Sequence, residues 1–520
     1  MSTVAGLPLA SLLSGRFAGL VAARFAEGVA PALAVAVFDG GAMRDSGLLG
    51  SIDGNGTAPG PGTAFRIASC TKSFTAAAVL ILRERGLLGL DDDVAGHLPG
   101  LRVFGPGGGT ARNCPVRLRH LLSMSSGLPT DDPWADRQES LSVAEMDELL
   151  RAGIRLARPP GTAYEYSNLG YALLGRVIEA VAGRPFVDFV RSELLEPLGL
   201  RATGFDSGVC ADGGVASGFR RTDAGWVEEP FSRPGAFSAI GGLFSTLADL
   251  GRWTAWLADG FGHGAETGPV PLSRAARRDM QRIQQPKPAD PGGAEGAGGS
   301  AGPVEGYGYG LVVQHHPAHG RIVGHSGGYP GFSSHMRWHP ESGAAVVGFE
   351  NATYSRVGIL VRRLLDGVLA DQGRAERVAA PGQAPAAGPD PAVGQARAAG
   401  PDPAPAPDPA PDWPRWPELQ AARTVVERLA RDWDDTLARS ILADNVELDS
   451  SLDERRRQLA AALEETGPVR PKRGSDGESP TPAQLEWTMP GTRGVLSCAV
   501  MLTPLNTPRV QSLTFTAVGP

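Results

Sequence analysis

The chain has 520 residues and a formal net charge of −7, and 42% of its residues are hydrophobic. That hydrophobic share excludes a fully disordered chain, and the length predicts about two or three domains. The mild acidic excess offers no basic surface for nucleic acid, and no apolar run approaches the roughly 20 residues of a membrane span. Because the first 15 residues carry no lysine or arginine and only a short apolar stretch, we expect a cytoplasmic protein without a secretory signal.

A large N-terminal domain is predicted from the elements at its two ends. The chain starts with an expected helix, Leu9–Phe25, and a buried strand, Ala32–Asp39, which ends at a Gly-Gly turn. Helical patterns then dominate from Ser69 to about Leu257. Four strands and a closing helix follow: Tyr309–His316, Arg321–His325, Phe332–Trp338, Ala344–Phe349 and Tyr354–Leu369. Short connections between these strands predict antiparallel pairing, so the fold class is α+β, an antiparallel sheet flanked by helices with a helical subdomain.

A proline-rich tract divides the chain. Residues 381–417 contain 12 prolines and almost no large apolar side chain, so they cannot bury a core and should form an extended linker. We therefore predict a large N-terminal domain over 1–375, a Pro/Ala/Gly-rich linker over 376–412 and a small α+β accessory domain over 413–520. The expected elements of the last are two helices, Leu419–Leu437 and Leu452–Glu465, and strands near Leu485, Val495 and Val510.

The first candidate for chemistry is Ser69-Cys70-Thr71-Lys72, which opens an apolar helix predicted over 69–85. A serine hydroxyl at a helix N-terminus lies where backbone N–H groups stabilise developing negative charge, and Lys72 returns to the same helix face. A serine nucleophile needs a base, and a buried lysine can lose its proton whereas arginine cannot. Only three of the 49 basic residues are lysines, which favours this interpretation over a plain serine N-cap.

The second candidate is Tyr166-Ser167-Asn168, which follows a turn signal at 159–161. In an extended segment Tyr166 and Asn168 point the same way, being two residues apart. A phenol near a lysine ammonium is expected to have a lowered pKa and to act as general base, while Asn168 holds a substrate amide or orients the lysine. Taken alone, a loop–helix junction with Asn168 as a cap is the better interpretation.

The third candidate is His325-Ser326-Gly327-Gly328, which closes the strand predicted over 321–325. Small residues at a strand edge let a substrate lie against the backbone, and the N–H of Gly328 could form an oxyanion hole with that of Ser69. His325 is a candidate to bind a carboxylate or to stabilise charge. The alternative is an ordinary glycine turn with a polar histidine at its mouth.

Together and in this order, the three motifs resemble the serine β-lactamase and penicillin-binding-protein superfamily, whose Ser-x-x-Lys, Tyr-x-Asn and Lys/His-[Ser/Thr]-Gly motifs line one cleft. The resemblance covers about residues 15–370. It is nearest to the class C β-lactamase-like group of family VIII carboxylesterases, D-stereospecific peptidases and acyl transferases. Supporting stretches are Phe65–Ala68, Leu121–Leu128, Pro160–Thr162 and Ala239–Thr246.

The resemblance implies a β-lactamase-like fold and a role for each matching residue. Ser69 would be the acylated nucleophile, and Lys72 and Tyr166 would share proton transfer. Asn168 and the triplet residues would support the substrate: His325, Ser326, Gly327 and Gly328. His325 departs from the lysine of penicillin-active enzymes, which counts against a dedicated β-lactamase.

The expected function is a serine hydrolase that cleaves a small ester, amide or short peptide through an acyl-enzyme on Ser69. Two alternatives remain open: an acyl transferase or peptide cyclase with an amine acceptor, and a catalytically silent scaffold on the same fold. No nucleic-acid or membrane partner is expected, and the sequence leaves the oligomeric state open.

No cofactor or metal is expected either. Six of the nine histidines fall between positions 315 and 339, but strand alternation scatters their side chains over both faces of a sheet. The four cysteines are far apart, a spacing that suits neither a disulfide framework nor zinc.

Overall fold

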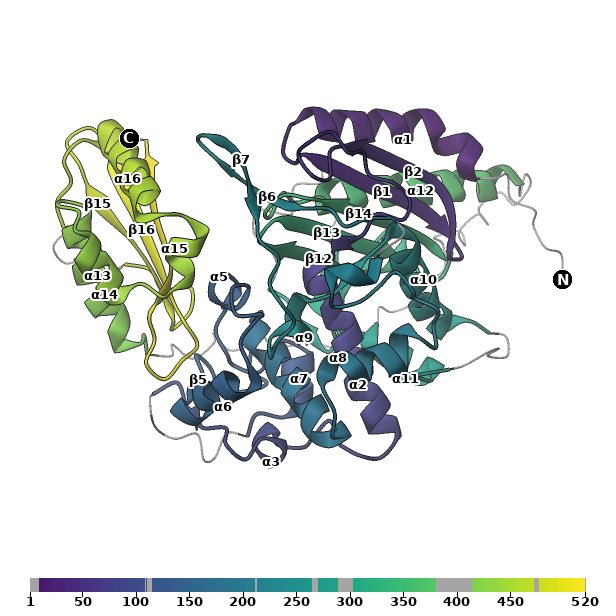
Figure 1. Cartoon of the computed structure of the whole chain (residues 1–520), viewed down its shortest axis with the longest axis horizontal. Helices are drawn as coiled ribbons and strands as arrows, with labels where there is room; N and C mark the ends of the chain where they lie inside the picture. Colours follow the sequence, from purple (N-terminus) through teal and green to yellow (C-terminus); the bar gives the residue numbers. More distant parts are fainter. Residues whose placement is uncertain are drawn as a thin grey trace, which may run out of the picture.

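The structure is a computed structural model that describes residues 9–107, 109, 115–210, 213–263, 270–288, 303–379, 414–471 and 477–519. Its main feature is an antiparallel eight-stranded sheet with the order β2-β1-β14-β13-β12-β11-β10-β9 (Figure 1). The strand bounds are β1 Ala32–Asp39, β2 Ala42–Gly50, β9 Gln285–Pro286, β10 Val304–Tyr307, β11 Val312–His316, β12 Gly320–Tyr329, β13 Phe332–Trp338 and β14 Ala344–Glu350. β1 pairs with β14, so the two ends of the large domain meet in one sheet, as predicted.

Both faces of this sheet are covered, which explains why β1 is an almost unbroken apolar run. Alternate residues of a strand face opposite sides. Leu33, Val35 and Val37 pack with α1 (Leu9–Ala26) and α12 (Gly358–Ala379). The residues between them belong to the core shared with the helical region. Figure 1 shows α1 and α12 on one side of the sheet and the helical region on the other.

The helical region is built around α2 (Thr71–Glu84), in which every residue from Thr71 to Leu82 is buried. A helix buried on all sides lies in the core rather than at a surface. The other helices here are α3 Val94–His97, α4 Leu118–Leu122, α5 Asp132–Ala135, α6 Val143–Ala152, α7 Asn168–Ala182, α8 Phe186–Val190, α9 Ser238–Gly241, α10 Leu247–Ala258 and α11 Arg274–Met280. Short helical turns are η1 Ala68–Cys70, η2 Arg191–Leu195, η3 Ser207–Cys210 and η4 Asp259–Phe261. Short strands pair β3 Phe65–Arg66 with β8 Phe244–Ser245, β4 Val103–Phe104 with β5 Ile154–Arg155, and β6 Gly218–Thr222 with β7 Gly225–Glu229.

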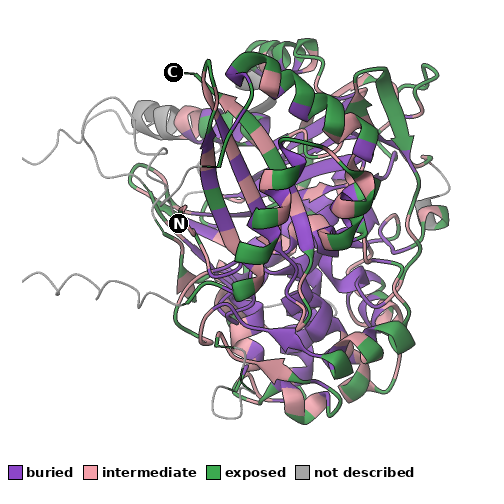
Figure 2. Cartoon of the chain, turned by 90° about the vertical axis from the view of Figure 1, so that its left-hand side faces the viewer, coloured by how far each residue is buried: buried purple, intermediate pink, exposed green. Residues whose placement is uncertain are grey.

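The C-terminal part is a three-stranded antiparallel sheet, β15-β16-β17, covered by helices. Its bounds are α13 Pro417–Leu429, α14 Asp435–Ile441, α15 Asn445–Asp449, α16 Leu452–Thr466, β15 Gln484–Pro490, β16 Val495–Leu502 and β17 Val510–Val518. Buried and partly exposed residues alternate along β16, as the strands facing the viewer in Figure 2 show. This sheet therefore buries one face only. The C-terminal part contacts the large domain at α5 through α15 and β17.

Several predicted element bounds are wrong, among them the start of the strand expected over Tyr309–His316, which begins at Val312. The helix expected over Leu419–Leu437 is two helices, because Asp434 accepts a hydrogen bond from Leu437 N at 2.8 Å and so caps a new helix. β12 does not end at His325 but continues to Tyr329. The closing helix starts at Gly358 rather than Tyr354, whose φ of 49° lies in the left-handed region and does not fit a helix.

The predicted linker lies outside the described residues, apart from 376–379, which are the last residues of α12. Within the described part of the chain, no helix combines the length and the apolar character that a membrane crossing requires.

Candidate active site

Ser69 and Lys72 meet at the N-terminal end of α2. Ser69 lies in the turn η1 that leads into the helix, and Lys72 lies in its first turn. Lys72 Nζ is 2.9 Å from Ser69 Oγ and 2.8 Å from the carbonyl oxygen of Ile240. Since a carbonyl only accepts hydrogen bonds, one N–H of the amine points to Ile240. In its neutral form the amine keeps a lone pair for the Ser69 hydroxyl.

Burial controls the charge of Lys72. The side chain is fully buried, and this desolvation lowers the pKa of Lys72 to about 8, against the opposing effects of Asp136, Asp132 and Asp131. A substantial fraction of the amine is therefore neutral near pH 8. A neutral amine 2.9 Å from a serine hydroxyl is suitable as a general base.

Tyr166 lies in the loop before α7, beside the same pair. Lys72 Nζ is 5.1 Å from the centre of its ring. The expected lowering of the phenol pKa is wrong. Burial raises the pKa of Tyr166 well above its usual value, and Asp132 raises it further. Tyr166 is thus a protonated phenol, a group that relays or donates a proton, while Lys72 is the better base.

Asn168 is the first residue of α7, but Ser167 caps that helix, accepting from Gly170 N at 3.2 Å. The Asn168 side chain turns to α5 and donates to Asp132 Oδ1 at 2.7 Å. Its own Oδ1 is buried and has no hydrogen-bond partner among the described residues. A buried amide oxygen without a partner is uncommon in folded proteins.

His325 is a neutral side chain that hydrogen-bonds with Tyr307 of β10. Its Nδ1 lies 2.6 Å from the carbonyl oxygen of Ser326, so Nδ1 carries the proton. Nε2, at 2.8 Å, then accepts from the hydroxyl of Tyr307. Burial, with a further contribution from Lys72, lowers the pKa of His325 to about 3. The neutral ring lies 6.3 Å from that of Tyr166, centre to centre.

The two glycines after His325 allow β12 to approach its neighbours. A Cβ atom on Gly327 would lie 2.2 Å from Ser334 Oγ and 2.5 Å from Ile67 O, in the segment before Ser69. A Cβ atom on Gly328 would lie 2.3 Å from the Tyr354 ring. These residues are glycines because there is no space for a side chain, not because a turn is needed. Ser326 between them and His325 is exposed.

The structure thus brings Ser69, Lys72, Tyr166, His325 and Gly327 to one place, while Asn168 faces α5. Sequence reasoning missed the acidic residues on the other side of Asn168: Asp131, Asp132 and Asp136. It also missed Tyr307. The Asp-Asp-Pro sequence at 131–133 marks a helix start, but no periodic pattern connects it with Asn168.

The clustered histidines do not form a metal centre within the described residues, where no group of three or more His, Cys, Asp or Glu is placed to hold an ion. His316 and His319 stack on each other, 4.8 Å between ring centres, and His339 bonds to Ser342. Cys70 and Cys498 are buried free thiols, and burial raises the pKa of Cys70 to about 12.

Comparison with known proteins agrees with this geometry. A family model described as Beta-lactamase matches residues 17–370. The chain belongs to the beta-lactamase family. It is 28% identical over 290 residues to penicillin-binding protein 4* of Bacillus subtilis, a match that covers 52% of this chain and 57% of that protein. The match thus spans little more than half the length of this relative.

Solved structures give the same result over the large domain. A penicillin-binding protein homologue from Pyrococcus abyssi, described as octameric, has 25% identity and a TM-score of 0.58, covering 68% of this chain and 77% of its own. The D-amino acid amidase of Ochrobactrum anthropi has 26% identity and a TM-score of 0.54, covering 70% of this chain and 99% of its own. The family fold predicted from the three motifs is confirmed: a β-lactamase-like α+β domain, here with an additional three-stranded C-terminal sheet.

Proposed function

We propose that this protein hydrolyses small esters or amides through an acyl-enzyme on Ser69. The observation that carries the proposal is the 2.9 Å contact between Ser69 Oγ and the buried Lys72 amine. A buried amine with a pKa near 8 is matched to accept a serine proton near neutral pH. Membership of the beta-lactamase family, whose members include serine hydrolases, supports the same chemistry.

The reaction begins when neutral Lys72 takes the Ser69 proton and Oγ attacks the substrate carbonyl carbon. The carbonyl electron pair moves to oxygen, and the N–H groups of Ser69 and Gly328 are the donors proposed to bind this oxyanion. When the tetrahedral intermediate collapses, the Lys72 proton passes to the leaving alkoxide or amine, with the Tyr166 hydroxyl as relay. The acyl group remains on Ser69.

Deacylation repeats these steps with water. Lys72, neutral again, takes a proton from a water molecule whose oxygen attacks the acyl carbonyl carbon. The second tetrahedral intermediate expels Ser69 Oγ, which recovers its proton from Lys72. The acid product leaves, and no cofactor takes part in this cycle.

Charge near Asn168 favours substrates that carry an amine. Asp132 is partly exposed, and neither it nor Asp136 forms an ion pair among the described residues. Burial raises the pKa of both carboxyl groups, and a positively charged substrate group beside them would stabilise their ionised form. The D-amino acid amidase among the structural relatives leads us to propose amino acid amides and esters as the substrate class.

The test is hydrolysis of a p-nitrophenyl ester by the full chain and by Ser69→Ala. We expect the variant to lose at least about 10³-fold in kcat, since the covalent route is removed. Intact mass after incubation with a fluorophosphonate should show one adduct on the wild-type chain and none on the variant. Full hydrolysis by Ser69→Ala would reject the proposal. A wild-type chain with neither turnover nor adduct would support the silent scaffold instead.

A further inference from the structure

The segment 130–137 connects the candidate active site with the C-terminal domain. On the active-site side, Asp131 accepts from the backbone N–H groups of Asn168, at 2.7 Å, and Leu169, at 2.9 Å. It also accepts from Ser167 Oγ at 3.1 Å. Asp131 therefore binds the N-terminus of α7 and fixes the loop that carries Tyr166.

This use of Asp131 leaves its own helix uncapped. Asp131 is the N-cap position of α5, but its side chain makes no capping hydrogen bond there. The first N–H groups of a helix have no partner within the helix and need an acceptor. For α5, the acceptor comes from the C-terminal domain.

That acceptor is Gln511 of β17. Trp134 N in the first turn of α5 donates to Gln511 Oε1 at 3.2 Å, and Gln511 Nε2 donates to Thr130 O at 2.9 Å. Nε2 also donates to Leu502 O, within its own domain, at 2.9 Å. The side chain is only 1% exposed. One buried amide thus binds both ends of the 130–134 segment.

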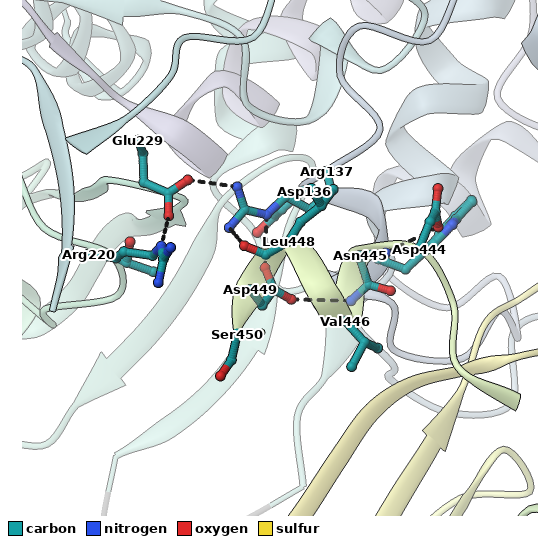
Figure 3. A network of polar contacts seen from close by, with 12 residues as sticks. Asp136, Arg137, Arg220, Glu229, Asp444, Asn445, Val446, Leu448, Asp449 and Ser450 are labelled. Carbon is teal, nitrogen blue, oxygen red and sulfur yellow. Dashed lines mark hydrogen bonds and ion pairs between the residues drawn. The ribbon is translucent and has the colours of Figure 1, made fainter. Parts of the chain in front are cut away.

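A second contact holds the same segment further along the chain. Arg137 donates to Asp449 Oδ1 at 2.8 Å in α15 and to Glu229 Oε2 at 2.9 Å in β7 (Figure 3). Its neighbour Asp136 accepts from the Tyr354 hydroxyl at 2.6 Å. Arg137 thereby connects the C-terminal domain with the large domain, one residue from Asp136.

We propose that the C-terminal domain completes the active site and that Gln511 is a positioning residue for catalysis. Gln511 takes over the capping of α5, which leaves Asp131 free to hold α7 and, through it, Tyr166 and Asn168. Without Gln511, Asp131 would turn back to its own helix and release the loop. The expected loss of activity rests on the proposed function, but the loosening of the loop can be measured separately by hydrogen exchange.

The experiment compares Gln511→Leu with the wild-type chain. The leucine keeps most of the side-chain volume but removes the acceptor for Trp134 N. We expect amide hydrogen exchange in the peptides covering 129–137 and 165–170 to become at least about tenfold faster. We also expect kcat for the p-nitrophenyl ester to fall about tenfold or more with KM changed less than about threefold, because a misplaced catalytic group slows chemistry rather than binding.

Glu418→Gln is the matched control. Glu418 is also in the C-terminal domain and bonds to Arg155 of the large domain at 3.1 Å, but it does not touch 130–137. This variant should keep wild-type exchange at 165–170 and wild-type kcat. If Gln511→Leu does not fold, Asp449→Asn tests the same segment through Arg137 and should show the same two changes, several-fold in size.

Two results would overturn the proposal: unchanged exchange at 165–170 in Gln511→Leu, or faster exchange with kcat within twofold of wild type. If the wild-type chain hydrolyses no ester, the proposed function fails, and the exchange data alone still decide whether Gln511 holds the loop.

Discussion

Lys72 Nζ lies 2.9 Å from Ser69 Oγ, and no carboxylate among the described residues forms an ion pair with this amine. A buried lysine without an ion-pair partner is poorly stabilised as a cation. The position therefore requires a group that can lose its proton. Lys72→Arg keeps the positive charge but removes that ability, and we expect kcat/KM for a p-nitrophenyl ester to fall by about 10²–10⁴-fold.

Lys287→Arg is the control for that substitution. Lys287 pairs with Glu305 and is partly exposed, so arginine can keep its charge and partner. We expect kcat/KM within about twofold of wild type. Equal losses in the two arginine variants would mean that the lysine-to-arginine change acts through general disturbance and not through the base.

The rate should follow the protonation state of Lys72. Since burial lowers the pKa of Lys72 to about 8, and only the neutral amine accepts the Ser69 proton, kcat/KM for an uncharged ester should rise with pH through about 8. The measurement is a pH profile from 6 to 9.5 on the full chain. The rate of fluorophosphonate labelling should rise over the same range, because it uses the same base.

His325 should add no step to this profile. The pKa of His325 is lowered to about 3, so the ring stays neutral throughout the measured range. A profile that is flat between pH 7 and 9, or a step near 6.5 that disappears in His325→Gln, would contradict these assignments.

Much of the site follows from local spacing. Ser69 and Lys72 are three residues apart at the start of one helix, Ser69 in the turn η1 and Lys72 in the first turn of α2, so the sequence alone brings them together. The strand pairing of β1 with β14 follows from their apolar runs. The pKa of Tyr166 could not be predicted this way, because it depends on how deeply the ring is buried and on Asp132, which a motif does not reveal.

The end of strand β12 was predicted wrongly because of its two glycines. Gly327 and Gly328 were expected to follow a strand that ends at His325, either at its edge beside the substrate or, as the alternative, in a glycine turn. In the structure they are strand residues without room for a side chain. A sequence cannot distinguish a glycine needed for φ from one needed for close approach. Contacts such as Gln511 with Thr130 join residues 381 positions apart and leave no local pattern.

Gly327→Ala tests the close approach of β12 to the nucleophile. The added methyl group would lie 2.5 Å from Ile67 O and 2.9 Å from Ala68 Cβ, so it should push β12 away from Ser69. We expect a loss of about 1–3 kcal/mol in the free energy of unfolding and at least about tenfold in kcat/KM. Thermal unfolding and ester hydrolysis measure the two effects.

Gly19→Ala in α1 is the control for that variant, because a Cβ atom on Gly19 would have no other atom within 4 Å. It should leave both the unfolding temperature and kcat/KM close to wild type. If Gly327→Ala behaves in the same way, the spacing between β12 and the Ser69 turn does not matter for catalysis.

The substrate's charge is tested with Asp132→Asn. The asparagine can still accept from the Asn168 amide through its own oxygen, as Asp132 does at 2.7 Å, but it removes the carboxylate. The wild-type chain should hydrolyse an amino acid p-nitroanilide with a free ammonium group at least about tenfold faster than its N-acetyl form, a preference of about 1.4 kcal/mol. In Asp132→Asn this preference should shrink several-fold through a higher KM for the free amine, while an uncharged ester keeps its kcat/KM within about threefold. Equal rates for the two anilides in the wild-type chain would show that the carboxyl groups do not select an amine. If Asp132→Asn also loses kcat/KM for the uncharged ester, Asp132 acts by orienting Asn168 instead.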